Sequence, residues 1–285
     1  MLTSCVKWAP LAALLAFAGG AEAQSAATAT GPQVSIDLPK PWPLRHLVAT
    51  GTLTIATTGK SAGVTFVDES GKLAGARIDL WTKLADDLGI KPDFVVIDWP
   101  GVLPGLAANR FDIACEGASW TKARLASPDF YMTRPLEVAI NVGVALKSSG
   151  IATWSDAAGK RLGGVKGEQE LKDLLAKAGA KTASLELPGV PEARLALLNG
   201  QYDVYGTGMQ VAQTLLKGED GDKFMILGEP TAVDASGFCV NKNEGDLAQA
   251  VNVLLAKYSV DGTMASINKK WDMPDTTANL AKLGY

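Results

Sequence analysis

Segments typical of β-strands and of α-helices alternate along most of this chain. In the first part, β-prone runs at Leu53–Thr57 and Phe94–Ile97 lie on either side of a helical pattern that repeats apolar residues from Ile78 to Leu88. Gly89 follows as a helix stop. Strands that alternate with helices are typical of parallel sheets covered by their crossover helices. We therefore predict an α/β fold built in layers.

A second unit with the same alternation follows a long apolar, β-branched run, Val138–Leu146. It holds a strand at Arg161–Val165, a helix at Gln169–Ala178 and another strand at Tyr202–Tyr205. We predict that Val138–Leu146 and a strand near Gly237–Val240 cross between the units and act as hinges. Two α/β lobes joined by two strands enclose a ligand cleft, since loops at the carboxyl ends of parallel strands open into it.

The chain begins with features of a secretory signal. Lys7 precedes an apolar stretch, Trp8–Ala18, and Ala21 and Ala23 supply the small residues of a cleavage site. Cys5 comes too early to carry a lipid, and no later run approaches the roughly 20 apolar residues of a membrane span. We expect a soluble exported protein, divided into a signal peptide (1–23), a flexible lead-in (24–43), lobe 1 (44–141 plus 237–285) and lobe 2 (142–236).

Composition excludes several classes of function. The net charge is −3, with 27 basic and 30 acidic residues interspersed, so we expect no nucleic-acid partner. The single histidine, His46, makes a histidine-based metal site or a serine-type triad untenable, and we expect no metal and no cofactor. Cys115 and Cys239 are either two buried apolar side chains or a disulfide.

The segment Gly117–Arg124 places two hydroxyls and a guanidinium in one short turn. Arg124 offers a planar fork of donors that fits a carboxylate, and Ser119 and Thr121 can bond the same ligand or orient the guanidinium. On the second lobe, Lys166–Gln169 occupies the corresponding loop at the start of a helix, where backbone N–H groups are unpaired. Both segments are predicted to face the cleft.

Five segments follow one another in the order of a known family. They read DESGKLAG with IDL over 68–80, DWPGVLPGL with RFD over 98–112, SWTKAR over 119–124, LLNGQYD over 197–203, and DGT with KW over 261–271. In these segments the chain resembles the periplasmic solute-binding proteins of family 3, the type II proteins that deliver polar amino acids to ABC importers. The resemblance covers about Leu44–Met273.

The resemblance implies a two-lobe periplasmic binding protein-like II fold, a periplasmic location and a monomer. It implies a small carboxylate-bearing ligand and an ABC permease as partners. Arg124 becomes the clamp for the ligand carboxylate, and Trp99 and Trp120 are interpreted as packing residues. The residues expected around the ligand are Glu116, Gly117, Ser119, Thr121, Arg124 and Thr58 on lobe 1, and Gly167, Glu168, Gln169, Thr207 and Gly208 on lobe 2.

Three departures from the family pattern bear on the ligand. The segment Lys60–Gly63 stands where the family carries a stacking aromatic residue, and Thr207–Met209 where it carries an aspartate for the ligand ammonium. Glu168 stands where the family has a hydroxyl residue. Glu168 or Glu116 can replace the missing acid, the ligand can differ from a standard amino acid, or Glu168 can face solvent at a helix start.

We interpret the chain as a binding protein that closes around its ligand by hinge motion, not as an enzyme. Two alternatives stay open. Cyclohexadienyl dehydratases share the fold and a segment similar to Thr57–Gly59, and an enzyme of this kind would use Glu168 or Glu170 as general acid. A binding domain that signals without transport is the other.

Overall fold

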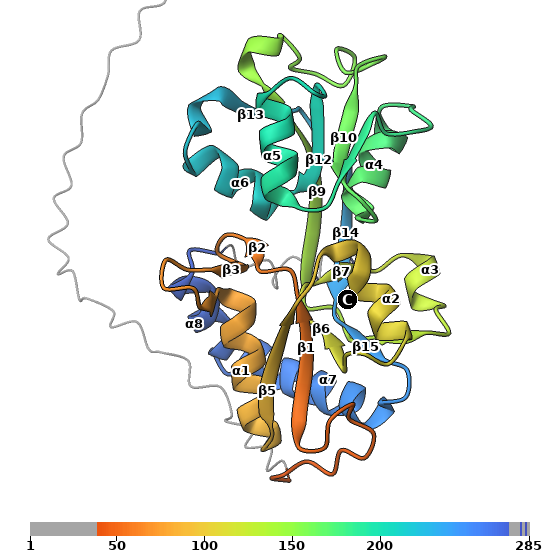
Figure 1. Cartoon of the computed structure of the whole chain (residues 1–285), viewed down its shortest axis with the longest axis vertical. Coiled ribbons are helices and arrows are strands. Elements are labelled where there is room, and N and C mark those ends of the chain that lie inside the picture. Colours follow the sequence, from red (N-terminus) through yellow and green to blue (C-terminus); the bar gives the residue numbers. More distant parts are fainter. Residues whose placement is uncertain (1–38, 274–279, 281–282, 284–285) are drawn as a thin grey trace, which may run out of the picture. The chain divides into compact units, whose positions relative to one another are not determined.

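The computed structural model describes residues 39–273, 280 and 283, which belong to one compact unit, Ile36–Tyr285. The predicted signal peptide and most of the predicted lead-in lie outside the described residues. No helix in the described ranges combines the length and apolar character that crossing a membrane requires. Helices and strands alternate along the compact unit, as the sequence pattern indicates (Figure 1).

One sheet has five strands in the order β5-β1-β6-β15-β8. The strands β5, β1 and β6 run parallel, and β15 and β8 are added to the sheet in antiparallel pairings. The predicted strand Leu53–Thr57 forms the buried part of β1, whose register on β5 pairs Thr52 with Lys91. The bounds of the five strands are β1 Thr52–Thr57, β5 Lys91–Val96, β6 Ile113–Ala114, β8 Phe130–Met132 and β15 Cys239–Asn241.

The second sheet has the order β11-β10-β12-β9-β14-β7, with β13 paired to β9. Its strands β11, β10 and β12 are parallel, whereas β9 is antiparallel to β12, β13 and β14. The bounds are β7 Ala118–Ser119, β9 Glu137–Leu146, β10 Leu162–Val165, β11 Leu185–Leu187, β12 Val204–Gly208, β13 Phe224–Ile226 and β14 Ala232–Gly237. A small third sheet joins β2 Lys60–Ser61, β3 Thr65–Val67 and β4 Leu73–Ala74.

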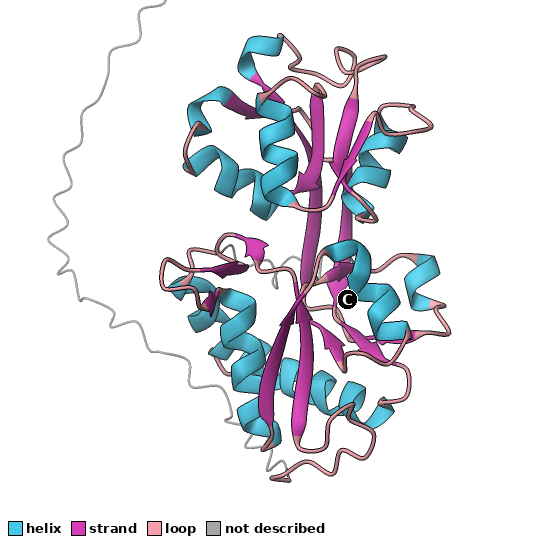
Figure 2. Ribbon diagram, in the orientation of Figure 1, coloured by secondary structure: helices cyan, strands magenta, loops and turns pink. Residues whose placement is uncertain are grey.

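Helices cover both large sheets (Figure 2). The helices of the five-stranded half are α1 Ala76–Leu88, α2 Trp99–Ala107, α3 Lys122–Leu125, α7 Gly245–Val260 and α8 Thr263–Lys270. Those of the seven-stranded half are α4 Gln169–Lys177, α5 Val190–Leu198 and α6 Met209–Lys217, and 3-10 turns occur at Lys147–Ser149 and Gly221–Lys223. Gly89 ends α1 with a φ of 76°, a left-handed conformation that glycine adopts without strain.

The C-terminal helix α7 packs against α1. Trp81 and Leu84 on α1 share one buried cluster with Val251, Leu254 and Tyr258 on α7, and all five are fully buried. Burying such side chains is worth about 1.5–3 kcal/mol each. This packing fixes α7 on α1.

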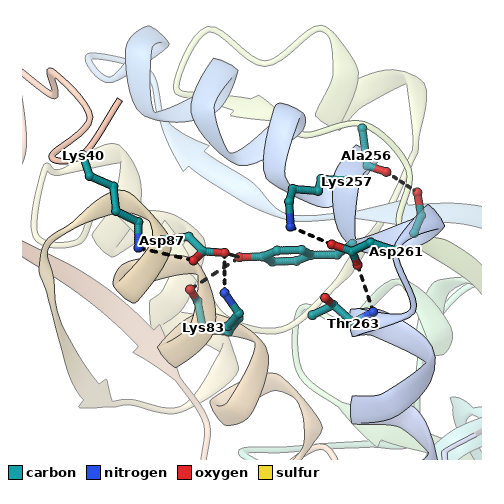
Figure 3. A network of polar contacts seen from close by, with 9 residues as sticks. Lys40, Lys83, Asp87, Ala256, Lys257, Asp261 and Thr263 are labelled. Atoms are coloured by element: carbon teal, nitrogen blue, oxygen red, sulfur yellow. Dashed lines mark hydrogen bonds and ion pairs between the residues drawn. The ribbon is translucent and has the colours of Figure 1, made fainter. Parts of the chain in front are cut away.

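A polar network completes the contact between these helices (Figure 3). The Tyr258 hydroxyl donates to Asp87 Oδ2 at 2.6 Å, and Lys83 Nζ approaches the same oxygen at 2.5 Å. Lys40 Nζ lies 3.6 Å from Asp87 Oδ1. Burial opposes ionisation of Asp87, but the hydrogen bonds from Lys83 and Tyr258 outweigh it and lower its pKa. Asp87 therefore stays charged and joins α1 to α7.

Two neighbouring strands, β9 and β14, run between the lobes (Figure 1). They pair antiparallel from Glu137 with Ser236 to Asn141 with Ala232. The predicted crossing Val138–Leu146 matches β9, but the second crossing strand begins at Ala232, earlier than the predicted Gly237–Val240. The chain then changes sheet at Phe238, between β14 and β15. The assignment of residues 44–141 plus 237–285 and 142–236 to separate lobes stays a prediction.

The two cysteines in the described part of the chain are unpaired and buried. Cys115 follows β6 and Cys239 begins β15. The Cys239 thiol lies 3.4 Å from the sulfur of Met132. Of the two alternatives drawn from the sequence, buried apolar side chains are therefore the one observed.

Candidate functional site

A cavity of about 340 Å³ is lined by residues of both lobes. First-lobe residues come from the β1–β2 loop, from α1 and α2, and from the turn between β6 and β7. Second-lobe residues come from the start of α4, the carboxyl end of β12 and the first turns of α6. Strand β9 passes along the cavity from Glu137 to Asn141. This volume suits a small molecule held between polar and apolar walls.

Most of the sequence-predicted ligand residues line this cavity. They are Thr58, Glu116, Gly117, Ser119, Arg124, Glu168, Thr207 and Gly208. Thr121, Gly167 and Gln169 are not among the lining residues. The Thr121 hydroxyl caps α3 by accepting from the backbone N–H of Arg124, and the Gln169 amide donates to Asp173 Oδ1 at 2.8 Å. Gly167 serves the turn before α4 with a φ of 80°.

Arg124 sits on a short helix, α3, where the sequence suggested a loop. Its Nη1 donates to the backbone oxygen of Ser119 at 3.1 Å, and this bond holds the half-buried guanidinium at the cavity wall. The ion pairs among the described residues do not include Arg124. Its charge is therefore available to a ligand anion.

Glu116 is clamped at the end of β6. Its Oε1 accepts from the hydroxyls of Thr57, Thr58 and Thr65 at 2.9–3.0 Å and from the backbone N–H of Thr58 at 2.7 Å. Its Oε2 is buried and receives no hydrogen bond from the described residues. Four donors on one oxygen fix the carboxylate and leave its second oxygen as an acceptor without a partner.

Arg77 and Glu137 form an ion pair in the same cavity, which the sequence analysis did not identify. The guanidinium is almost fully buried and also lies over the Phe238 ring, 5.4 Å from its centroid. From the second lobe, Gln210 donates to Glu137 Oε2 at 3.3 Å. The sequence pattern does indicate that Arg77 needs an acidic partner. Arg77 shares the apolar face of α1 with Trp81, Leu84 and Leu88, where a buried charge requires a partner.

Two further acids reach the cavity from the start of α4. Burial raises the pKa of Glu168 well above its ordinary value, and Glu170 and Glu116 add to the rise while Arg124 opposes it. Burial likewise raises the pKa of Glu170, again against the effect of Arg124. Glu168 was predicted as a ligand residue, and Glu170 was named only as a candidate general acid.

Trp99 and Trp120, which were both interpreted as packing residues, differ in their position relative to the cavity. Trp99 belongs to the buried core, as predicted, but it also lines the cavity. Trp120 is half-buried and is not among the lining residues.

In the segment Lys60–Gly63, Ser61 lines the cavity and Lys60 Nζ forms ion pairs with Asp98 and Glu192 at 2.8 and 3.5 Å. Lys60 thus contacts both lobes beside the cavity.

The sequence model of the bacterial extracellular solute-binding proteins, family 3, matches residues 53–274. The chain belongs to this family. A probable amino-acid ABC transporter-binding protein of Haemophilus influenzae is 31% identical over 242 residues, which cover 80% of this chain and 87% of that protein. The structure of an ancestral arginine-binding protein bound to arginine superposes with a TM-score of 0.70 at 29% identity, covering 79% of this chain and 99% of that one.

These comparisons confirm the predicted family, the two-lobe fold and the role in solute binding. A shorter match concerns the enzyme alternative: the cyclohexadienyl dehydratase of Pseudomonas aeruginosa is 37% identical over 76 residues, which cover 27% of this chain and 28% of that protein. This match shows similarity over about a quarter of each chain. The two proteins described above, which match along most of the chain, are binding proteins.

Proposed function

We propose that this chain is the exported, substrate-binding component of an amino-acid ABC importer, and that Arg124 binds the ligand carboxylate. The observation that carries this proposal is the position of Arg124, whose guanidinium lines an interlobe cavity and forms no ion pair with an acid among the described residues. A planar guanidinium binds a carboxylate through two parallel hydrogen bonds. The relatives named for amino-acid binding support the choice of ligand class.

Closure of the two lobes completes the mechanism. Arg124 and Ser119 offer the first contacts on lobe 1, and the start of α4 and the residues Thr207 and Gly208 approach from lobe 2. A ligand that touches both lobes favours the closed state by the contacts it gains there. The closed form is then the one that an ABC permease in the inner membrane recognises, with the protein acting as a periplasmic monomer.

A thermal-shift screen of the 20 standard amino acids tests the proposal, and titration calorimetry of each hit measures its affinity. We expect Arg124→Ala to reduce the affinity of every carboxylate hit by about 100-fold, since charge-assisted bidentate pairs are the strong ones. Lys122→Ala is the matched control, because Lys122 is an exposed cation on the same helix. Equal affinity in wild type and Arg124→Ala would contradict the role of Arg124.

A dehydratase activity is the second candidate, because Glu168 and Glu170 lie in the cavity with raised pKa values and can hold a proton there. Incubation with prephenate, followed by detection of phenylpyruvate, separates the two functions. We expect no product above the spontaneous rate. Turnover that Glu170→Gln abolishes would replace the binding function with an enzymatic one.

A further inference from the structure

The charges that line the cavity do not balance. They comprise two guanidinium groups and four carboxyl groups, belonging to Arg77, Arg124, Glu116, Glu137, Glu168 and Glu170. Arg77 and Glu137 neutralise each other as an ion pair. If Arg124 is occupied by a ligand carboxylate, then Glu116, Glu168 and Glu170 have no cation. Uncompensated acids in a site that excludes water are costly, so the ligand must supply positive charge or the acids must keep protons.

Two oxygen atoms in the cavity wall also lack donors. One is Oε2 of Glu116, and the other is Oδ1 of Asn141, a side chain that is only 1% exposed. The orientation of the Asn141 amide follows from its Nδ2, which donates to Asp173 Oδ2 at 2.7 Å. The remaining Asn141 oxygen is an acceptor, and a buried acceptor without a donor is the exception in folded proteins. Both oxygen atoms can accept hydrogen bonds from N–H groups of a ligand.

Asn141 and the acids of α4 lie near the carboxyl end of β12. Gly208 pairs with Asn141 in the ladder between β12 and β9. A Cβ atom built on Gly208 would lie 3.9 Å from Oε1 of Glu170. Glu170 therefore brings a carboxyl group from another element, α4, to the segment Thr207–Met209.

We propose that the cleft binds an amino acid with a second cationic group, its carboxylate on Arg124 and its cationic groups among Glu116, Glu168, Glu170 and Asn141. This inference rests on the proposed function and specifies the ligand class of the same site. A ligand of this kind supplies two positive charges and the N–H donors that Glu116 and Asn141 lack. With a neutral side chain, the acids would have to keep their protons.

The groups around Glu168 and Glu170 make binding depend on pH. These groups are Arg124 on α3, Glu116 after β6, Asp173 on α4 and Tyr205 on β12. Burial and mutual repulsion favour the protonated acids in the unliganded protein, whereas a ligand cation favours the ionised acids. Binding of a cationic ligand should therefore release protons, and the affinity should fall as the pH falls.

The experiment compares arginine with citrulline, which has nearly the same shape but a neutral side chain. We expect calorimetry at pH 8 to show arginine binding at least about tenfold more tightly, the effect of one charged hydrogen-bonding partner. Titration of arginine in phosphate and in Tris, whose ionisation enthalpies differ, should show proton release. Equal affinities for arginine and citrulline, or no proton release, would overturn the inference while leaving amino-acid binding intact. Failure of every amino acid to bind would overturn the proposed function itself.

Isosteric variants of the two α4 acids test whether these side chains cause the preference for arginine. We expect Glu168→Gln and Glu170→Gln each to reduce the preference for arginine over citrulline by about tenfold and to reduce proton release. Glu229→Gln is the control, because the Glu229 side chain is 88% exposed in the second lobe. Circular dichroism would show that the variants fold. An unchanged preference in both α4 variants would contradict the assignment.

Discussion

Arg77 and Glu137 join the first helix of the lobe to the strand that leaves it. Arg77 lies in the first turn of α1, and Glu137 is the first residue of β9, 60 positions further along the chain. The Arg77 side chain is 6% exposed and that of Glu137 is 16% exposed. The pair thus connects the body of lobe 1 to a crossing strand at the wall of the cavity.

Removing one member of this pair should destabilise the protein strongly. We expect Arg77→Met to lower the free energy of unfolding by about 3–5 kcal/mol, because it leaves Glu137 as a poorly solvated charge. Urea unfolding at pH 7 measures the change. The control Lys122→Met removes an exposed cation from another helix, α3, and we expect less than about 1 kcal/mol. Similar losses in the two variants would contradict this account.

Glu244 should make stability depend on pH. It is fully buried beside Asp112, and neither of its oxygens receives a hydrogen bond from the described residues. Burial and Asp112 raise its pKa from the ordinary 4.5 to about 10. Between these values the folded state binds one proton more than the unfolded state, so stability falls as pH rises, by about 1.4 kcal/mol per unit where the difference is complete.

The variant Glu244→Gln keeps the shape and removes the titration. We expect its free energy of unfolding to change less between pH 5 and pH 9 than that of the wild type, with a relative gain at the higher pH. Urea unfolding across this range, with the exposed Glu229→Gln as control, measures the difference. If wild type and Glu244→Gln follow parallel curves, the proton is not on Glu244.

Gly75 should tolerate no side chain. It precedes α1 with a φ of 127°, and a Cβ atom there would lie 2.2 Å from the backbone oxygen of Val64. Gly71 provides a comparison, with a φ of 80° and open space around the same position. We expect Gly71→Ala to cost about 1 kcal/mol through backbone strain alone. Gly75→Ala should cost clearly more, measured as the shift of the urea midpoint, and equal costs would refute the steric argument.

The two thiols should be inert in the folded protein. Burial raises the pKa of Cys115 well above its ordinary value, with a further contribution from Glu116, and it raises the pKa of Cys239 to about 12. Only the thiolate reacts readily. In a chain that begins at Gln24, we expect Ellman's reagent to modify neither thiol without denaturant and both in 6 M guanidinium. Rapid modification of the native protein would show that these sites open.

The fold could be predicted in large part because its signals are local and regular. The apolar spacing from Ile78 to Leu88 sets α1, and Gly89 ends it where predicted. Pairings between strands that are distant in the sequence were harder to predict. The short strands β7 and β8 carry too few residues for a pattern, and the crossing strand β14 alternates weakly, which explains its late predicted start.

The site was predicted less completely than the fold. Motif residues such as Arg124 and Ser119 line the cavity, because they belong to one short local segment that the sequence pattern marks. Side chains that act through distant partners were missed: Glu137 begins an apolar strand, and Asn141 lies within it. Their roles depend on α1 and α4, which only the tertiary structure brings to β9.

The antiparallel ladder between β9 and β14 has a consequence for how the lobes separate. Since five consecutive residue pairs connect the two crossing strands, the lobes are linked by a ribbon and not by two independent cords. A ribbon flexes most easily perpendicular to its plane and resists sliding of one edge past the other. We therefore expect the two lobes to separate by a hinge rotation, with Glu137 and Asn141 staying at the hinge.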